Sequence, residues 1–224
     1  MIDKIFQARV PQKVGMYMLG LFILAFGVAL SINSRLGVSP VNSIAYIVGR
    51  IFDNDPGRWT TAMFVLFMLI QIAILRKNFK PFHIIQIIFA AFFGLFLDLT
   101  LWMQGGFQIP TYFGQLAMLI ASIVFIAAGL VLIISAKIVA LPPEALCLTI
   151  ADKIGAKFHN VKIIVDSSLV LIAIALSLLF LGGIDGIREG TVLSAILIGK
   201  VIPPIRKALS PILSWACKEG PPNA

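Results

Sequence analysis

Three acidic side chains of this sequence lie inside strongly apolar stretches. They are Asp98, Glu144 and Asp166, whereas the other acidic residues fall in expected loops or at expected helix ends. An ionisable group at membrane depth costs at least about 2.5–3.5 kcal/mol on insertion scales, so a functional role is the first hypothesis for each. The alternative is structural pairing with nearby basic residues, namely Arg35, Arg50 or Arg58 for Asp98 and Lys137 or Lys162 for Asp166.

Glu144 follows Pro142 and Pro143 at the start of a short apolar stretch. Proline suits the first turn of a helix, where its missing N–H costs little. A carboxylate in that turn could simply stabilise the helix dipole. It could instead bind a proton or a cation near the middle of the membrane. Both interpretations of Glu144 stay open at this point.

The composition identifies the kind of protein that must position these acids. Of the 224 residues, 59% are hydrophobic and 12% are charged, whereas a soluble domain has about 45–50% apolar and about 25% charged residues. We therefore expect an all-α integral membrane protein that binds the lipid bilayer. This class excludes a nucleic-acid-binding module, and two cysteines are too few for a disulfide-stapled secreted domain. We expect neither a cofactor nor a metal site, and no enzymatic activity.

Six stretches are long enough to cross the membrane, which takes about 20 mostly apolar residues. The predicted spans are residues 14–34, 59–75, 81–104, 112–136, 161–181 and 187–205. Two further apolar stretches, 40–52 and 143–154, are too short to cross and predict re-entrant or interfacial helices. The resulting domains are an N-terminal segment 1–13, a single membrane domain 14–207 and a C-terminal tail 208–224.

The basic residues predict the orientation. With six spans, Arg35, Arg50, Arg58 and Arg188 lie on one side, and the remaining 14 of the 18 lysines and arginines lie on the other. Cytoplasmic loops carry the excess of basic residues. Both termini are therefore expected in the cytoplasm of a multi-pass protein in the bacterial inner (plasma) membrane.

The chain also contains a candidate repeat. Residues 26–52 align with 128–154, so that Gly27 matches Gly129, Arg35 matches Lys137 and, after one inserted residue, Pro40 matches Pro143. The repeating unit is a span, a short helix and two more spans, over about 14–104 and 112–207. Because each unit crosses three times, the second must be inverted relative to the first. Inverted repeats with broken helices are typical of transporters, with the site near the midplane between the repeats.

This arrangement predicts a binding site near the beginnings of the two short helices. If they dip into the membrane, their N-termini would lie deep and could hold an anion or carboxylate. If they lie flat, they would only brace the two surfaces. The candidate site residues are Ser39, Pro40, Asn42, Pro143, Glu144, Asp98, Asp166 and Ser167.

Several short motifs resemble those of a known family. The final third contains K-x-x-x-D from Lys162 to Asp166, then I-R-E-G-T and Gly199, and the first half contains L-G-V-S-P at 36–40 and F-G-L-F-L-D at 93–98. These stretches are similar to the YczE/YyaS/YitT family of bacterial membrane proteins, over about residues 14–207. The resemblance implies a multi-span inner-membrane protein and singles out Pro40, Asp98, Glu144, Asp166, Gly190, Thr191 and Gly199. It supplies no catalytic residue.

Two functions fit these observations. The first is a transporter of a small solute or ion, with its site between the inverted repeats, either as a monomer or as a homodimer. The alternative is a non-enzymatic binding or accessory subunit, similar to the substrate-binding component of an energy-coupling-factor transporter. Because such a component need not contain an inverted repeat, a confirmed repeat would favour the transporter.

Overall fold

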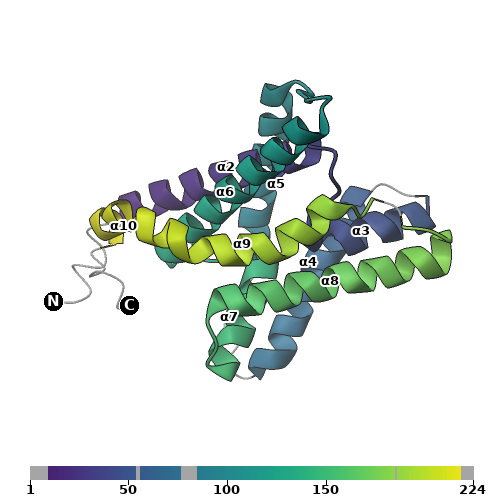
Figure 1. Ribbon diagram of the computed structural model, residues 1–224. Coiled ribbons are helices and arrows are strands. Elements are labelled where there is room, and N and C mark those ends of the chain that lie inside the picture. Colours follow the sequence, from purple (N-terminus) through teal and green to yellow (C-terminus); the bar gives the residue numbers. More distant parts are fainter. Residues whose placement is uncertain (1–9, 54–55, 77–84, 185, 218–224) are drawn as a thin grey trace.

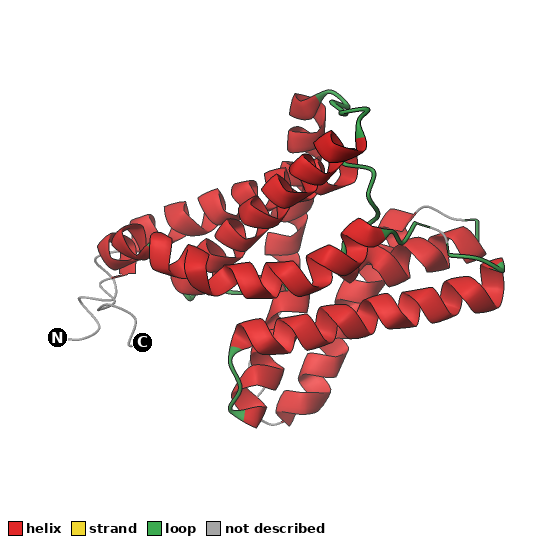
Figure 2. Cartoon of the chain, viewed as in Figure 1, coloured by secondary structure: helices red, strands yellow, loops and turns green. Residues whose placement is uncertain are grey.

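The structure is a computed structural model that describes residues 10–53, 56–76, 85–184 and 186–217. All regular secondary structure in these ranges is helical (Figure 2). The helices are α2 Val10–Asn33, α3 Pro40–Ile51, α4 Pro56–Leu75, α5 Gln86–Gln104, α6 Tyr112–Ala136, α7 Pro142–Ile154, α8 Phe158–Leu181, α9 Glu189–Ala208 and α10 Ser210–Cys217.

Every predicted span and both predicted short stretches contain a helix, so the all-α fold class is confirmed. Helix α8 begins at Phe158, three residues before the predicted span, which brings Lys162 into the helix. The predicted tail contains α10, and its Leu213 is buried in the main core. The predicted start of the third span, at 81–84, lies outside the described residues.

Four helices are long and apolar enough to cross a membrane, namely Pro11–Asn33, Gln86–Gln104, Tyr112–Ala136 and Phe158–Leu181. Of the other two predicted spans, α4 contains a shorter apolar helix, Ala62–Leu75. Helix α9 has 20 residues but includes Pro203, Pro204, Arg206 and Lys207 near its end. Length and composition therefore support a membrane protein with four clear spans.

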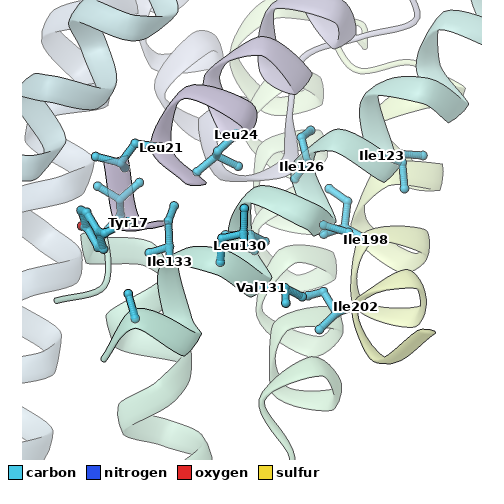
Figure 3. Close-up of a cluster of buried hydrophobic side chains, with 14 of the residues drawn as sticks. Tyr17, Leu21, Leu24, Ile123, Ile126, Leu130, Val131, Ile133, Ile198 and Ile202 are labelled. Atoms are coloured by element: carbon cyan, nitrogen blue, oxygen red, sulfur yellow. The ribbon is translucent and has the colours of Figure 1, made fainter. Parts of the chain in front are cut away.

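Helices α2 and α6 share the largest interface of the described chain. Two glycines permit their close approach. A Cβ at Gly27 would lie 2.8 Å from the backbone nitrogen of Ile126, and one at Gly129 would lie 2.6 Å from that of Leu24. The main core lies along this crossing, and α9 completes it with Ile198 and Ile202 (Figure 3).

The two short helices pack on the same pair of long helices. Helix α3 contacts α4 and α8, and α7 also contacts α4 and α8. Helix α9 lies between the α2–α6 pair and α8 (Figure 1). Helix α5 packs mainly on α2, and most of its apolar side chains are exposed or half-buried. The short helices are thus enclosed by longer ones, which keeps their first turns away from the surface.

The connection between α2 and α3 is fixed to the start of α9. The backbone N–H of Val38 donates to the carbonyl of Gly186 at 3.0 Å, and that of Gly190 donates to the carbonyl of Leu36 at 2.9 Å. The Thr191 hydroxyl donates to the carbonyl of Val38 at 2.7 Å. A Cβ at Gly190 would lie 2.5 Å from the Leu36 oxygen, so the loop can approach α9 only because residue 190 is glycine. This contact accounts for the Gly-Thr pair of the I-R-E-G-T motif.

Candidate functional site

The site begins where the two short helices start. Both follow a residue in extended conformation, Ser39 before α3 and Leu141 before α7. Both have proline in the first turn: Pro40 in α3, Pro142 and Pro143 in α7. The proline ring fixes φ near the helical value, so the sequence itself determines where each helix begins.

Helices α7 and α8 follow one another through a tight turn at Gly155, which has a left-handed φ of +67°. Glu144 lies ten residues before the end of α7, or about 15 Å along the helix at 1.5 Å per residue. Lys162 and Asp166 lie about 6 and 12 Å along α8 by the same rise, one turn apart on one face. The hairpin therefore brings these three side chains to a similar depth.

The three side chains form a buried ionic cluster, which we call the α7–α8 triad. The Lys162 ammonium lies 3.1 Å from Asp166 Oδ2 and donates to Oδ1 at 3.3 Å. It lies 3.6 Å from Glu144 Oε1. Relative exposures are 6% for Glu144, 2% for Lys162 and 1% for Asp166. The predicted pairing of Asp166 with Lys162 is thus present, while Lys137 is not in the cluster.

The triad is unevenly satisfied. Glu144 Oε2 is buried and has no hydrogen-bond partner among the described residues. Two carboxylates share one ammonium, so the ionised triad has one negative charge in excess. Burying an uncompensated charge is strongly unfavourable, so such a group takes up a counter-charge or loses its own. The arrangement is suited to binding a positively charged species at Glu144.

A small cavity of about 70 Å³ separates the beginnings of α3 and α7 and contacts the triad. It brings together most of the predicted site residues, namely Ser39, Pro40, Asn42, Pro143, Glu144 and Asp166. Leu24 and Val28 of α2 and Ile126 and Leu130 of α6 close it with apolar side chains. Both short helices thus begin at one small cavity at the α2–α6 crossing, with a mostly apolar lining into which the triad introduces charged groups.

Two predicted site residues do not belong to this cavity. Asp98 is exposed on α5, between exposed Leu95 and Trp102 on the same helix face. Ser167 is half-buried on α8 and does not line the cavity, although it is next to Asp166. Within the described chain no salt bridge joins Asp98 to Arg35 or Arg50, and the side chain of Arg58 lies outside it.

Lys162 is the site residue that sequence reasoning placed elsewhere. We counted it among the loop residues of the basic side, but it is buried inside α8. The signal was present in the sequence, because a lysine four residues before an aspartate lies on the same helix face as that aspartate. Residues Glu144 and Lys162 are distant in sequence, so their contact needs the α7–α8 turn to be known.

A second, larger cavity of about 790 Å³ lies between α4, α5, the end of α6 and α7. Amide groups line its wall. Gln86 Nε2 donates to Gln71 Oε1 at 3.2 Å, and Gln71 Nε2 donates to Thr149 Oγ1 at 3.1 Å. Lys137 and Lys153 lie at its border. We call this cavity the α4–α5 groove.

Comparison with known proteins identifies relatives but no template for the fold. The chain is 28% identical to "Uncharacterized membrane protein YczE" of Bacillus subtilis (strain 168) over 190 residues, which is 83% of this chain and 81% of the relative. It is 26% identical to "Uncharacterized protein YyaS" of the same organism over 137 residues, 61% of this chain and 67% of that protein. No solved structure matches the chain.

The first relative is named as a membrane protein, and the long apolar helices of this chain agree with that name. The resemblance to YczE and YyaS is confirmed by these matches. One family covers nearly the entire chain, from residue 11 to residue 207. The protein belongs to this family, which is described as a family of unknown function (DUF6198).

Proposed function

We propose that this protein is a membrane transporter of a small solute or ion, and that its binding site is the cavity between the beginnings of α3 and α7. The observation that carries this proposal is the position of the cavity. Two short helices from different halves of the chain begin there, beside a buried triad with an unsatisfied carboxylate oxygen. Ionisable groups at membrane depth mark transport pathways and proton relays in many proteins.

The packing of the helices supports an inverted repeat. Exchanging the halves maps α2 to α6, α3 to α7, α4 to α8 and α5 to α9. The α2–α5 contact then corresponds to the α6–α9 contact. The α3–α8 contact corresponds to the α4–α7 contact, and the α3–α4 contact corresponds to the α7–α8 contact. All six contacts are present. One pair differs, because α8 and α9 pack closely whereas α4 and α5 hardly touch within the described residues.

Matched residues of the two halves also behave alike. Gly27 and Gly129, which align in sequence, both lie at the α2–α6 crossing and both let the partner backbone approach. Arg35 and Lys137, also aligned, have left-handed φ values of +56° and +54°; Arg35 is the second residue after α2 and Lys137 is the first residue after α6. Two halves that were unrelated in sequence would have no reason to share a left-handed residue at the same aligned position. We infer that the halves are related by an inverted repeat.

The proposal includes six crossings, with α4 and α9 completing the four clear spans, and both termini in the cytoplasm of a bacterial inner membrane. The uneven distribution of basic residues supports that orientation. In this orientation the α4–α5 groove faces the cytoplasm and the loop before α3 faces the outside.

Labelling of a single cysteine from either side tests the proposal. We replace Cys147 and Cys217 with alanine and introduce Ser39→Cys, a half-buried position in the cavity. A membrane-impermeant maleimide is applied to right-side-out and inside-out vesicles. A transporter opens to both sides in turn, so we expect Ser39→Cys to react in both preparations. The matched control is Ser122→Cys, at a fully buried core position on α6, which should react in neither.

The outcome separates the two functional classes. Reaction from one side only, combined with no solute uptake by proteoliposomes, would favour the binding or accessory subunit. Reaction from neither side would contradict both functions at this cavity, because no ligand could reach it.

A further inference from the structure

We propose that the cavity between α3 and α7 binds one exchangeable proton on Glu144, and that this proton is the coupling ion of the protein. The second part rests on the proposed transport function, whereas the first part does not. The inference is carried by the geometry of the α7–α8 triad and by the unpartnered oxygen of Glu144, a residue that lines the cavity.

The number of charges requires one positive charge from outside the triad. Glu144, Lys162 and Asp166 are the ionisable side chains among the described residues lining the cavity, and each is more than nine-tenths buried. Fully ionised, they sum to one negative charge. One bound proton makes the cluster neutral and leaves one carboxyl group and one ion pair.

The contacts indicate which carboxylate carries the proton. Both Asp166 oxygens lie within 3.3 Å of the Lys162 ammonium. Glu144 offers it one oxygen at 3.6 Å, and its Oε2 has no partner within the described chain. Protonating Asp166 would sacrifice the better ion pair, whereas protonating Glu144 preserves it and gives the orphan oxygen an O–H group. Glu144 lines the cavity together with Ser39 and Asn42, whose side chains contain oxygen acceptors.

The other groups near Glu144 do not change this balance. Cys147 of α7 and Tyr17 of α2 interact electrostatically with Glu144, and a thiol and a phenol are ordinarily neutral near pH 7. Helix α4 presents the neutral amide of Gln71 to α7, and α5 reaches that network through the neutral amide of Gln86. Helix α8 contributes Lys162 and Asp166, so the charge count above is the one that Glu144 experiences.

A proton fits this site better than a metal cation. A metal ion on Glu144 would lie beside the Lys162 ammonium, which is 3.6 Å from the same carboxylate, and the two positive charges would repel. A hard cation also needs six or more oxygen ligands or waters. Among the described residues that line the cavity, side-chain oxygens come from Ser39, Asn42, Glu144 and Asp166, and both Asp166 oxygens already face the Lys162 ammonium. In the binding step a hydronium ion gives its proton to Glu144 Oε2, one O–H bond forms, and one water is released.

Infrared difference spectroscopy on the purified full-length protein in phospholipid nanodiscs tests this assignment. The sample is stepped from acidic to alkaline buffer, and the C=O stretch of protonated carboxyl groups is followed in light and heavy water. We expect the wild type to lose one such band and Glu144→Gln to lack it. Asp98→Asn, as the matched single-carboxyl control, should retain the band, whereas in Asp166→Asn the remaining Glu144–Lys162 pair is neutral without a proton, so the band should disappear at lower pH than in the wild type. Size-exclusion chromatography verifies folding, and Glu144→Asp should restore a band at a shifted position.

The possible results have distinct consequences. A titrating band that persists in Glu144→Gln, or no band in the wild type, would overturn the assignment to Glu144. A band that 100 mM sodium chloride removes, and the same concentration of choline chloride does not, would overturn the proton in favour of a metal cation. A normal band in a protein that maleimide reaches from one side only would support the proton site and contradict the transport function. Labelling from both sides in a protein without the band would support the transport function and contradict the proton site.

Discussion

The two sides of α7 are held in place by different chemistry. On the α8 side, α7 is bound through the ionic triad, and α8 in turn packs closely on α9. A Cβ at Gly199 would lie 2.8 Å from the His159 carbonyl oxygen, so glycine is what allows these two helices to touch. On the α4 side, α7 is bound through the neutral amide of Gln71, and α4 and α5 enclose the groove of about 790 Å³.

Under the proposed inverted repeat, α8–α9 and α4–α5 are corresponding pairs of helices in two different arrangements. Helices α8 and α9 pack closely at Gly199, whereas α4 and α5 stay apart within the described residues. Side-chain amides that bridge a gap can reform at little cost, whereas buried charges and close backbone contacts cannot. If the two halves exchange their conformations during transport, we expect α4 and α5 to move more readily than α8 and α9.

The largest effect is expected from Lys162→Met, which breaks the charged attachment of α7 to α8. The change leaves two buried carboxylates without their ammonium. Breaking a buried ion pair in this way lowers the free energy of unfolding by about 3–5 kcal/mol. Unfolding in mixed micelles measures the effect.

Two variants sharpen this experiment. Lys200→Met removes an exposed lysine from α9 and should leave the stability nearly unchanged. Adding Glu144→Gln and Asp166→Asn to Lys162→Met removes the uncompensated charges and should recover much of the loss. A loss of less than about 1 kcal/mol for Lys162→Met alone would mean that the triad does not hold the two helices together.

The second effect separates the glycines of the two halves. Gly190→Ala puts a methyl group 2.5 Å from the Leu36 oxygen, so the α2–α3 loop must move off α9. Overpacking of this kind costs about 1–3 kcal/mol. The matched control is Gly94→Ala in α5, where nothing lies within 4 Å. Alanine is the better helix former by up to about 1 kcal/mol, so this variant should be neutral or stabilised.

Thermal unfolding of Gly190→Ala and Gly94→Ala, in parallel with the wild type, measures the two shifts. Equal destabilisation of both variants would contradict the contrast between the packed α9 and the open face of α5.

The smallest effect is expected at the amide pair of the α4–α5 groove. Gln71→Leu and Gln86→Leu each remove one partner of the 3.2 Å hydrogen bond that links α4 to α5. Hydrogen bonds between membrane helices average about 0.6 kcal/mol, with a maximum of about 1.7 kcal/mol. A double-mutant cycle should return a coupling energy near the average.

Ser122→Ala, which shares no hydrogen bond with either glutamine, provides the additive control for Gln86→Leu. A coupling energy above about 1.7 kcal/mol would contradict the contrast, because the amide pair would then hold α4 to α5 too strongly for a contact that reforms at little cost.

The helices themselves could be predicted from the sequence because membrane thickness fixes their length. Charges and turn residues end the spans, and prolines mark the beginnings of both short helices. Within the described residues four spans satisfy length and composition by themselves, whereas α4 and α9 are assigned as spans from the pattern of the whole chain.

The candidate site was predictable where a residue type determines its place. Pro40 and Pro143 fix the helix starts that line the cavity, and Glu144 is tied to its helix start. The sequence placed Asp98 within a predicted span, but it did not indicate on which face of that helix the side chain lies. Helix α5 is apolar around its whole circumference, so no polar stripe indicates which face is buried. Lys162 was predicted as a partner of Asp166 but not as a residue of the buried site, because a lysine near a span end normally reaches back to the interface.

The prolines at the starts of α3 and α7 have one more consequence. A helix start usually attracts negative ions because its first N–H groups have no acceptor within the helix. Proline has no N–H, and α7 has it at both of its first positions, with one more at the start of α3. The two neighbouring helix starts therefore lack three of the N–H groups that could otherwise donate hydrogen bonds to an anion. Restoring them would take no new charge at all, only ordinary residues in place of Pro40, Pro142 and Pro143.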